Sequence, residues 1–237
     1  MVAMSNFADM VRTAVAEKAD IIFSGAGLPL NLPSFLTEGA RTKLAPIVSS
    51  ARAAKLLCRK WFTEYNYIPD AIVVEGPKAG GHLGYKTEQI ADEHFALEQI
   101  VPEVAAEVGA FADEHRCHIP VIAAGGIYTG EDMYRMMSLG ASGVQLGTRF
   151  VTTEECDADL RFKQAYLDAQ AEDIEIIKSP VGMPGRAISG EFLREVEQGH
   201  TRPKACRFHC IKTCDPAKTP YCIITALFNA FRGNLKK

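Results

Sequence analysis

The sequence contains no apolar run that approaches the about 18 residues of a membrane span. Its first residues, MVAMSNFADMV, lack the basic region and the apolar core of a signal peptide. The net charge is only -3, which gives no reason to expect a nucleic acid or an anionic membrane surface as a partner. No repeat or low-complexity linker divides the 237 residues. These absences, with 47% hydrophobic residues for a core, predict one large domain over residues 1–237 of a cytoplasmic enzyme.

The cysteines lack the C-x2-C pairs of most zinc sites and the spacing of common ferredoxins. Four of the seven form a C-x3-C-x3-C-x7-C pattern in the segment 200–237, namely Cys206, Cys210, Cys214 and Cys222. Without a signal peptide, reduced thiols are the expected state. We therefore predict no metal here, although zinc and an iron–sulfur cluster remain open alternatives.

Strand and helix patterns alternate along the chain, which is typical of a parallel sheet with helices packed outside it. Apolar runs predict five strands, at Ile21–Ser24, Ala45–Ser49, Ala71–Glu75, Pro120–Ala124 and Gly143–Leu146. Helices are predicted from a possible Asn6 cap through Val15, around Leu32–Glu38, over Ala51–Glu64, once or twice within Thr87–Glu114, and over Glu131–Leu139. Residues 173–179 read as extended, and Gly182, Pro184 and Gly185 then predict a loop.

Two of these strands end at glycines that are followed by helix-like segments. The first leads into Gly125 and Gly126, and the second into Gly147 and Thr148. Glycine lets the backbone approach a phosphate, and the amides that open the next helix favour its charge. In (β/α)8 barrels a phosphate often binds on the loops after strands seven and eight. These two glycine loops together predict a phosphate site, and plain tight turns are the alternative.

The segment EGPKAGGHLGY, from Glu75 to Tyr85, places His82 directly after a double glycine at the end of a predicted strand. An imidazole with a pKa near 6.5 can accept a proton at neutral pH. His82 is therefore the predicted catalytic residue. The alternative is a loop histidine that hydrogen-bonds only to the backbone.

The motifs AGGHLG, PVIAAGGI and VQLGTRF, in this order and spacing, resemble those of the FMN-dependent nitronate monooxygenases, also called 2-nitropropane dioxygenases. Flavin-dependent enoyl-ACP reductases share them. The resemblance is clearest from Met1 to Phe150. It implies an FMN-binding (β/α)8 TIM barrel, of which about five of the eight strands are present. We therefore expect a truncated barrel with two unpaired sheet edges, which favours pairing with another chain, such as a homo-oligomer.

The same resemblance implies which residues bind FMN. Its phosphate is expected on the amides of Gly125, Gly126, Gly147 and Thr148. The family's Gln-x-Gly-Thr run corresponds to residues 145–148, so Gln145 and Leu146 are also expected contacts. Gly80 and Gly81 would let the backbone pass close to the ring system, and Glu75 stands where relatives often carry glutamine.

Three functions remain open from the sequence. The first is a nitronate monooxygenase, in which His82 deprotonates a nitroalkane or binds the nitronate, and O2 and FMN then yield a carbonyl compound and nitrite. The second is a nicotinamide-dependent enoyl-ACP reductase. The third is an inactive truncated barrel that binds FMN weakly or only pairs with a partner.

Overall fold

A computed structural model describes residues 1–203 and 205–236 and divides the chain into two compact units. The first unit comprises Met1–Ala79 and Gly84–Gln145, and the second comprises Gly80–Leu83 and Leu146–Lys237. The sequence predicts one domain because no linker-like composition marks the change. The chain passes between the units at Ala79–Gly80, at Leu83–Gly84 and directly after a strand at Gln145, and the single domain stays a prediction.

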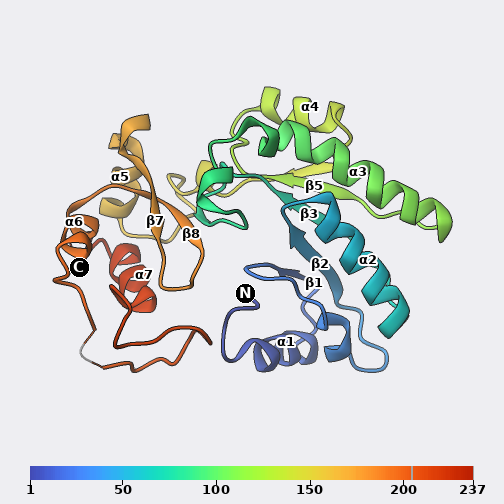
Figure 1. Ribbon diagram of the computed structural model, residues 1–237, viewed down its shortest axis with the longest axis horizontal. Helices are drawn as coiled ribbons and strands as arrows, with labels where there is room; N and C mark the ends of the chain where they lie inside the picture. The colour runs from blue at the N-terminus through green and yellow to red at the C-terminus, as the bar shows by residue number, and fades with distance from the viewer. Residues whose placement is uncertain (204, 237) are drawn as a thin grey trace. The chain divides into compact units, whose positions relative to one another are not determined.

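The first unit is built on a five-stranded parallel sheet (Figure 1). Its strands, in spatial order, are β1 (Ile21–Ser24), β2 (Lys43–Val48), β3 (Ile72–Glu75), β5 (Val121–Ala124) and β6 (Gly143–Gln145). The prediction of an α/β fold with five parallel strands is confirmed. Because parallel strands carry their carboxyl ends at one edge, the segments after β3, β5 and β6 begin side by side.

Helices cover the sheet of this unit. They are α1 (Phe7–Ala16), α2 (Ala51–Tyr65), α3 (Leu97–Glu114) and α4 (Gly130–Ser138). The central strand β3 is buried from Ile72 to Val74, as expected for a strand covered on both faces. Trp61 of α2 is fully buried, and its Nε1 donates a hydrogen bond to the carbonyl of Pro29 at 3.0 Å.

Three short 3-10 helices replace parts of the predicted helices. They are Leu32–Phe35, Thr87–Gln89 and Glu93–Phe95. The predicted helix around Leu32–Glu38 is therefore only four residues long, since Leu36 already has an extended backbone with ψ 134°. Asn6 is the N-cap of α1 as predicted, but its side chain makes no capping hydrogen bond.

The second unit contains a three-stranded antiparallel sheet that the sequence did not predict (Figure 1). Its order is β4 (Gly81–His82), β8 (Pro184–Ile188) and β7 (Ile174–Lys178). The extended segment over β7 was predicted, but the loop predicted around Pro184 and Gly185 is wrong. Pro184 is the first residue of β8, a position where a strand tolerates a missing amide hydrogen.

The rest of the second unit is helical or irregular. Its helices are the 3-10 helices Thr148–Phe150 and Ala171–Asp173 and the α-helices α5 (Leu160–Asp168), α6 (Glu191–Glu197) and α7 (Ile223–Phe231). No helix among the described residues has both the length and the apolar character needed to cross a membrane.

Candidate functional site

Glycine is required at both positions of the loop that follows β5. Gly125 and Gly126 have φ values of +98° and +77°, which side-chain-bearing residues rarely adopt. A Cβ on Gly125 would lie 3.0 Å from the amide nitrogen of Ala79 and 3.0 Å from the carbonyl of Gly76. A Cβ on Gly126 would lie 2.8 Å from the Cβ of Lys78. The loop after β5 thus packs against the loop after β3.

The amides of this loop can serve as donors to an anion. Among the described residues, no backbone hydrogen bond uses the amide of Gly125 or Gly126 as its donor. Two amides before α4 are already engaged, because the Asp132 carboxylate accepts hydrogen bonds from the amides of Tyr128 and Thr129 at 3.1 and 2.9 Å. These bonds hold the pKa of Asp132 below its usual value. An anion is therefore expected at the glycines and not at the capped start of α4.

Glu75 ends β3 at the same edge of the sheet. Burial raises the pKa of its carboxyl. The Tyr85 hydroxyl donates a hydrogen bond to the Glu75 backbone carbonyl at 2.6 Å, and the Gly76 amide donates to Ala124 at 2.8 Å. These bonds hold the start of the loop 76–80 against β5.

The remaining predicted flavin contacts are divided between the two units. Gln145 is the last residue of the first unit and is paired with Ala124 in the sheet. Leu146, Gly147 and Thr148 open the second unit, and Gly147 does not have a positive φ. Gly80 lies near Thr148, since a Cβ on Gly80 would be 3.7 Å from the threonine Oγ1. The flavin contacts of these residues stay predictions.

His82 lies in β4, which pairs with β8, so the predicted catalytic residue is held in a sheet. Its Nε2 lies 2.6 Å from Oγ of Ser179, which is only 5% exposed. Burial lowers the pKa of His82, so the imidazole is neutral at physiological pH. No local sequence pattern indicates Ser179 as the partner of His82, which is 97 residues away.

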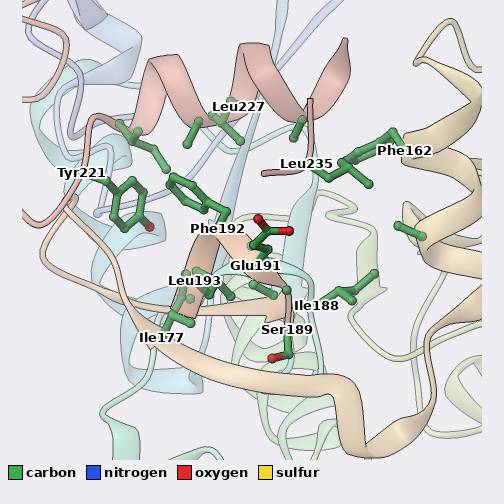
Figure 2. Close-up of a pocket in the computed structure, with 18 of the residues that line it drawn as sticks. Phe162, Ile177, Ile188, Ser189, Glu191, Phe192, Leu193, Tyr221, Leu227 and Leu235 are labelled. Carbon is green, nitrogen blue, oxygen red and sulfur yellow. The ribbon is translucent and has the colours of Figure 1, made fainter. Parts of the chain in front are cut away.

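A cavity of about 590 Å³ in the second unit is lined by His82 and Ser179. Its wall is mostly apolar, with side chains from α5, β7, β8, α6 and α7 (Figure 2). The labelled apolar residues are Phe162, Ile177, Ile188, Phe192, Leu193, Tyr221, Leu227 and Leu235. Glu191 also lines it and forms an ion pair with Lys236 at 2.9 Å. The cavity can bind an apolar molecule beside a neutral imidazole.

The four clustered cysteines are half-buried free thiols. Burial is the largest cause that raises the pKa of Cys210 and of Cys214, and the neighbouring thiols raise both further. In the part of the chain that the structure describes, no three Cys, His, Asp or Glu side chains are grouped to hold a metal. The absence of a bound metal at these thiols stays a prediction.

The family model described as nitronate monooxygenase matches residues 2–219. The chain belongs to the nitronate monooxygenase family. Probable nitronate monooxygenases from Staphylococcus saprophyticus and Staphylococcus haemolyticus are 31% and 34% identical over 131 residues. Each match covers 54% of this chain and 34% of the relative, so the chain matches about a third of the length of these curated relatives.

Solved structures agree with this membership. FabK from Thermotoga maritima is similar with a TM-score of 0.64 and 29% identity, covering 82% of this chain and 54% of that chain. A nitroalkane oxidase from Streptomyces ansochromogenes is similar with a TM-score of 0.61 and 25% identity, covering 78% of this chain and 49% of that chain.

Proposed function

We propose that this chain carries the FMN phosphate loop and the substrate cavity of a nitronate monooxygenase, which converts alkyl nitronates and O2 to carbonyl compounds and nitrite. The observation that carries the proposal is His82 on the wall of an apolar cavity, beside the hydroxyl of Ser179. Family membership and the likeness to a nitroalkane oxidase support it.

The residues present fit an FMN phosphate. Two amides at Gly125 and Gly126 are available as donors, and their backbone leaves no room for a Cβ. We propose that these amides bind the phosphate. Bound FMN would supply the electron-accepting and O2 chemistry.

The chain's own residues then bind and orient the substrate. An aliphatic tail fits the apolar wall, since it would lose water contact on entering. The nitro or nitronate head would face His82, whose neutral ring at physiological pH can exchange a proton or a hydrogen bond with it.

A nicotinamide-dependent reductase that acts on enoyl thioesters is the second candidate. It is favoured by the likeness to FabK and by the apolar cavity, which would also take an acyl chain. Under this proposal NADH or NADPH reduces the flavin. The third reading, a chain that no longer retains flavin, predicts no bound chromophore.

The test is the visible spectrum of the purified chain after addition of FMN and removal of the excess, followed by anaerobic ethyl nitronate or NADH. Bleaching by the nitronate alone supports the first proposal, and bleaching by NADH alone supports the reductase. A chain that retains no flavin refutes both for this polypeptide. The matched variant His82→Gln should keep the flavin and lose most of the nitronate-driven bleaching.

A further inference from the structure

The chain leaves α7 through a turn with a fixed geometry. Gly233 has a φ of +74°, and its amide donates a hydrogen bond to the carbonyl of Ala230 at 2.9 Å. The amide of Asn234 donates to the carbonyl of Asn229 at 2.7 Å. These two bonds form a Schellman motif, in which a glycine in the left-handed conformation ends the helix. The turn therefore sets the direction in which the next residues run.

The same turn is anchored on the start of α5. The amide of Asp159 donates to the carbonyl of Phe231 at 2.9 Å. Nη2 of Arg161 donates to the carbonyl of Arg232 at 3.1 Å. A Cβ on Gly233 would overlap the carboxylate of Asp159 and would lie 2.6 Å from Nε of Arg161. The backbone at the turn is thus packed directly against another helix of the second unit.

The segment Asn234–Lys236, which we call the strap, then lies along the apolar cavity. All three of its residues line the cavity, and Nζ of Lys236 forms an ion pair at 2.9 Å with Glu191, at the start of α6. The two polar residues of the strap are exposed, whereas Leu235 is half-buried. Leu235 is therefore the apolar side chain that the strap adds to the cavity wall, together with Leu227 of α7 (Figure 2).

The cavity is larger than a small nitronate requires. Pockets of about 300–1,000 Å³ bind drug-sized ligands, and this cavity measures about 590 Å³. Ethyl nitronate carries a single short alkyl group, which would leave most of the apolar wall uncovered. Burial of apolar surface is favourable in proportion to its area, so a ligand with a longer apolar tail fits this wall better.

We propose that Leu235 is a specificity-determining residue that covers the apolar tail of the substrate, and that the ion pair between Lys236 and Glu191 closes the strap over it. The inference rests on the proposed function and deepens it, because it assigns to the substrate a tail longer than that of ethyl nitronate. Both side chains of the ion pair are exposed, so the pair is weak and is screened by salt. The strap can therefore open to admit the ligand.

Binding of the tail is measured on the chain without flavin. The neutral fluorescent probe N-phenyl-1-naphthylamine is displaced by nitroethane, 1-nitrobutane and 1-nitrohexane, which differ only in the length of the tail. Each added methylene that becomes buried should lower the dissociation constant up to about fourfold. The same dissociation constant for all of these compounds, or no displacement by any of them, overturns the proposal when circular dichroism shows a folded chain.

Variants of Leu235 test its role in specificity. Leu235→Ala should lower the ratio of the dissociation constants of nitroethane and 1-nitrohexane about tenfold, because the far part of the tail becomes exposed to water. Leu235→Met has a similar volume and should keep the wild-type ratio. Leu235→Gln changes polarity more than size and should also lower the ratio, so the test does not depend on one variant. A wild-type ratio in Leu235→Ala or in Leu235→Gln, whichever is folded, overturns the role of Leu235.

The ion pair is tested by its charge. Lys236→Gln should weaken the binding of 1-nitrohexane about twofold to fivefold at low salt, and the difference from the wild type should disappear at high salt. Exchange of the two charges, by Lys236→Glu together with Glu191→Lys, should restore binding. Lys218→Gln is the matched control, because Lys218 forms an exposed ion pair with Asp215 at 3.4 Å and is not among the described residues that line the cavity. Wild-type binding by Lys236→Gln at low salt overturns closure by the ion pair.

Flavin bleaching separates this inference from the proposed function. The displacement measurements need neither flavin nor turnover. A chain that binds the longer tails as expected but whose flavin is not bleached by any nitronate refutes the proposed function alone. A chain whose flavin is bleached by ethyl nitronate, but which binds nitroethane and 1-nitrohexane equally well, refutes the inference alone.

Discussion

Replacement of Gly125 by alanine tests whether the loop after β5 is as tightly fixed as its geometry indicates. The new Cβ would meet two backbone atoms, the amide nitrogen of Ala79 and the carbonyl oxygen of Gly76, each at 3.0 Å. Neither can move without shifting the turn in which the Ala79 amide donates to Gly76 at 3.2 Å. Relief by side-chain rotation is therefore not available.

The expected cost has two parts. A side chain in a left-handed backbone conformation costs roughly 1–2 kcal/mol, and overpacking at a close contact costs about 1–3 kcal/mol. Gly125→Ala should thus lower the free energy of unfolding by about 2–5 kcal/mol. Urea unfolding followed by circular dichroism measures it, provided that the transition is two-state.

Gly109→Ala is the matched control for this change. Gly109 lies inside α3, has no positive φ, and a Cβ there would have no atom within 4 Å. Alanine should therefore stabilise the helix by about 0.5–1 kcal/mol. The close contact at Gly125 does not exist if the free energy of unfolding of Gly125→Ala lies within about 0.5 kcal/mol of the wild-type value while the control behaves as expected.

Four further predictions address other parts of the chain. Burial raises the pKa of Glu75, so its contribution to stability is present below its unfolded pKa of 4.5 and is lost as the pH rises through the folded value. Urea titrations across pH should show that Glu75→Gln removes this loss, and identical pH profiles would contradict it. Thr129 caps α4 in a capping box, in which Thr129 and Asp132 each accept a hydrogen bond from the other's amide. In urea unfolding, Thr129→Ala should lower the free energy of unfolding by about 1 kcal/mol, and Thr129→Ser should lower it much less. Asn66 ends α2 in the left-handed conformation, with φ 50°. The free energy of unfolding of Asn66→Ala should therefore be about 1 kcal/mol lower than that of Asn66→Gly, and equal urea midpoints of the two variants would refute this. Mass spectrometry of the anaerobically purified chain should find well below one metal per chain, and one zinc or iron per chain would show that the clustered cysteines rearrange to bind it.

The sequence predicts the first unit well because its signals are local. Each parallel strand is a short apolar run that stops at glycine or at a polar residue, and Ile21–Ser24 has the predicted bounds without a change. Three of the other strands shift by one residue at one end, and β2, which covers Lys43–Val48, shifts by two residues at its start and one at its end. Burial on both faces produces such runs in the inner strands β2, β3 and β5, so these strands can be recognised without knowledge of their partner strands.

The second unit was poorly predicted because its sheet depends on pairing over long distances in the sequence. β4 is two residues long, and it becomes a strand only because Gly81 and His82 pair with Arg186 and Gly185. Glycine and proline in β8 are local signals for a loop, and the pairing with β7 overrides them. The hydrogen bond between His82 and Ser179 follows from the same pairing, so no local pattern indicates it.

The phosphate site after β5 stays a prediction, but the structure changes the physical reason for it. From the sequence, part of the anion binding is expected at the amides that open the helix after β5. Asp132 already accepts hydrogen bonds from the amides of Tyr128 and Thr129, and its carboxylate brings a negative charge to that helix start. An anion there would meet repulsion and occupied donors. The amides of Gly125 and Gly126 donate to no backbone acceptor among the described residues, and their direction depends on φ values that glycine alone adopts readily. The double glycine is therefore required for the donors themselves and not only for close approach.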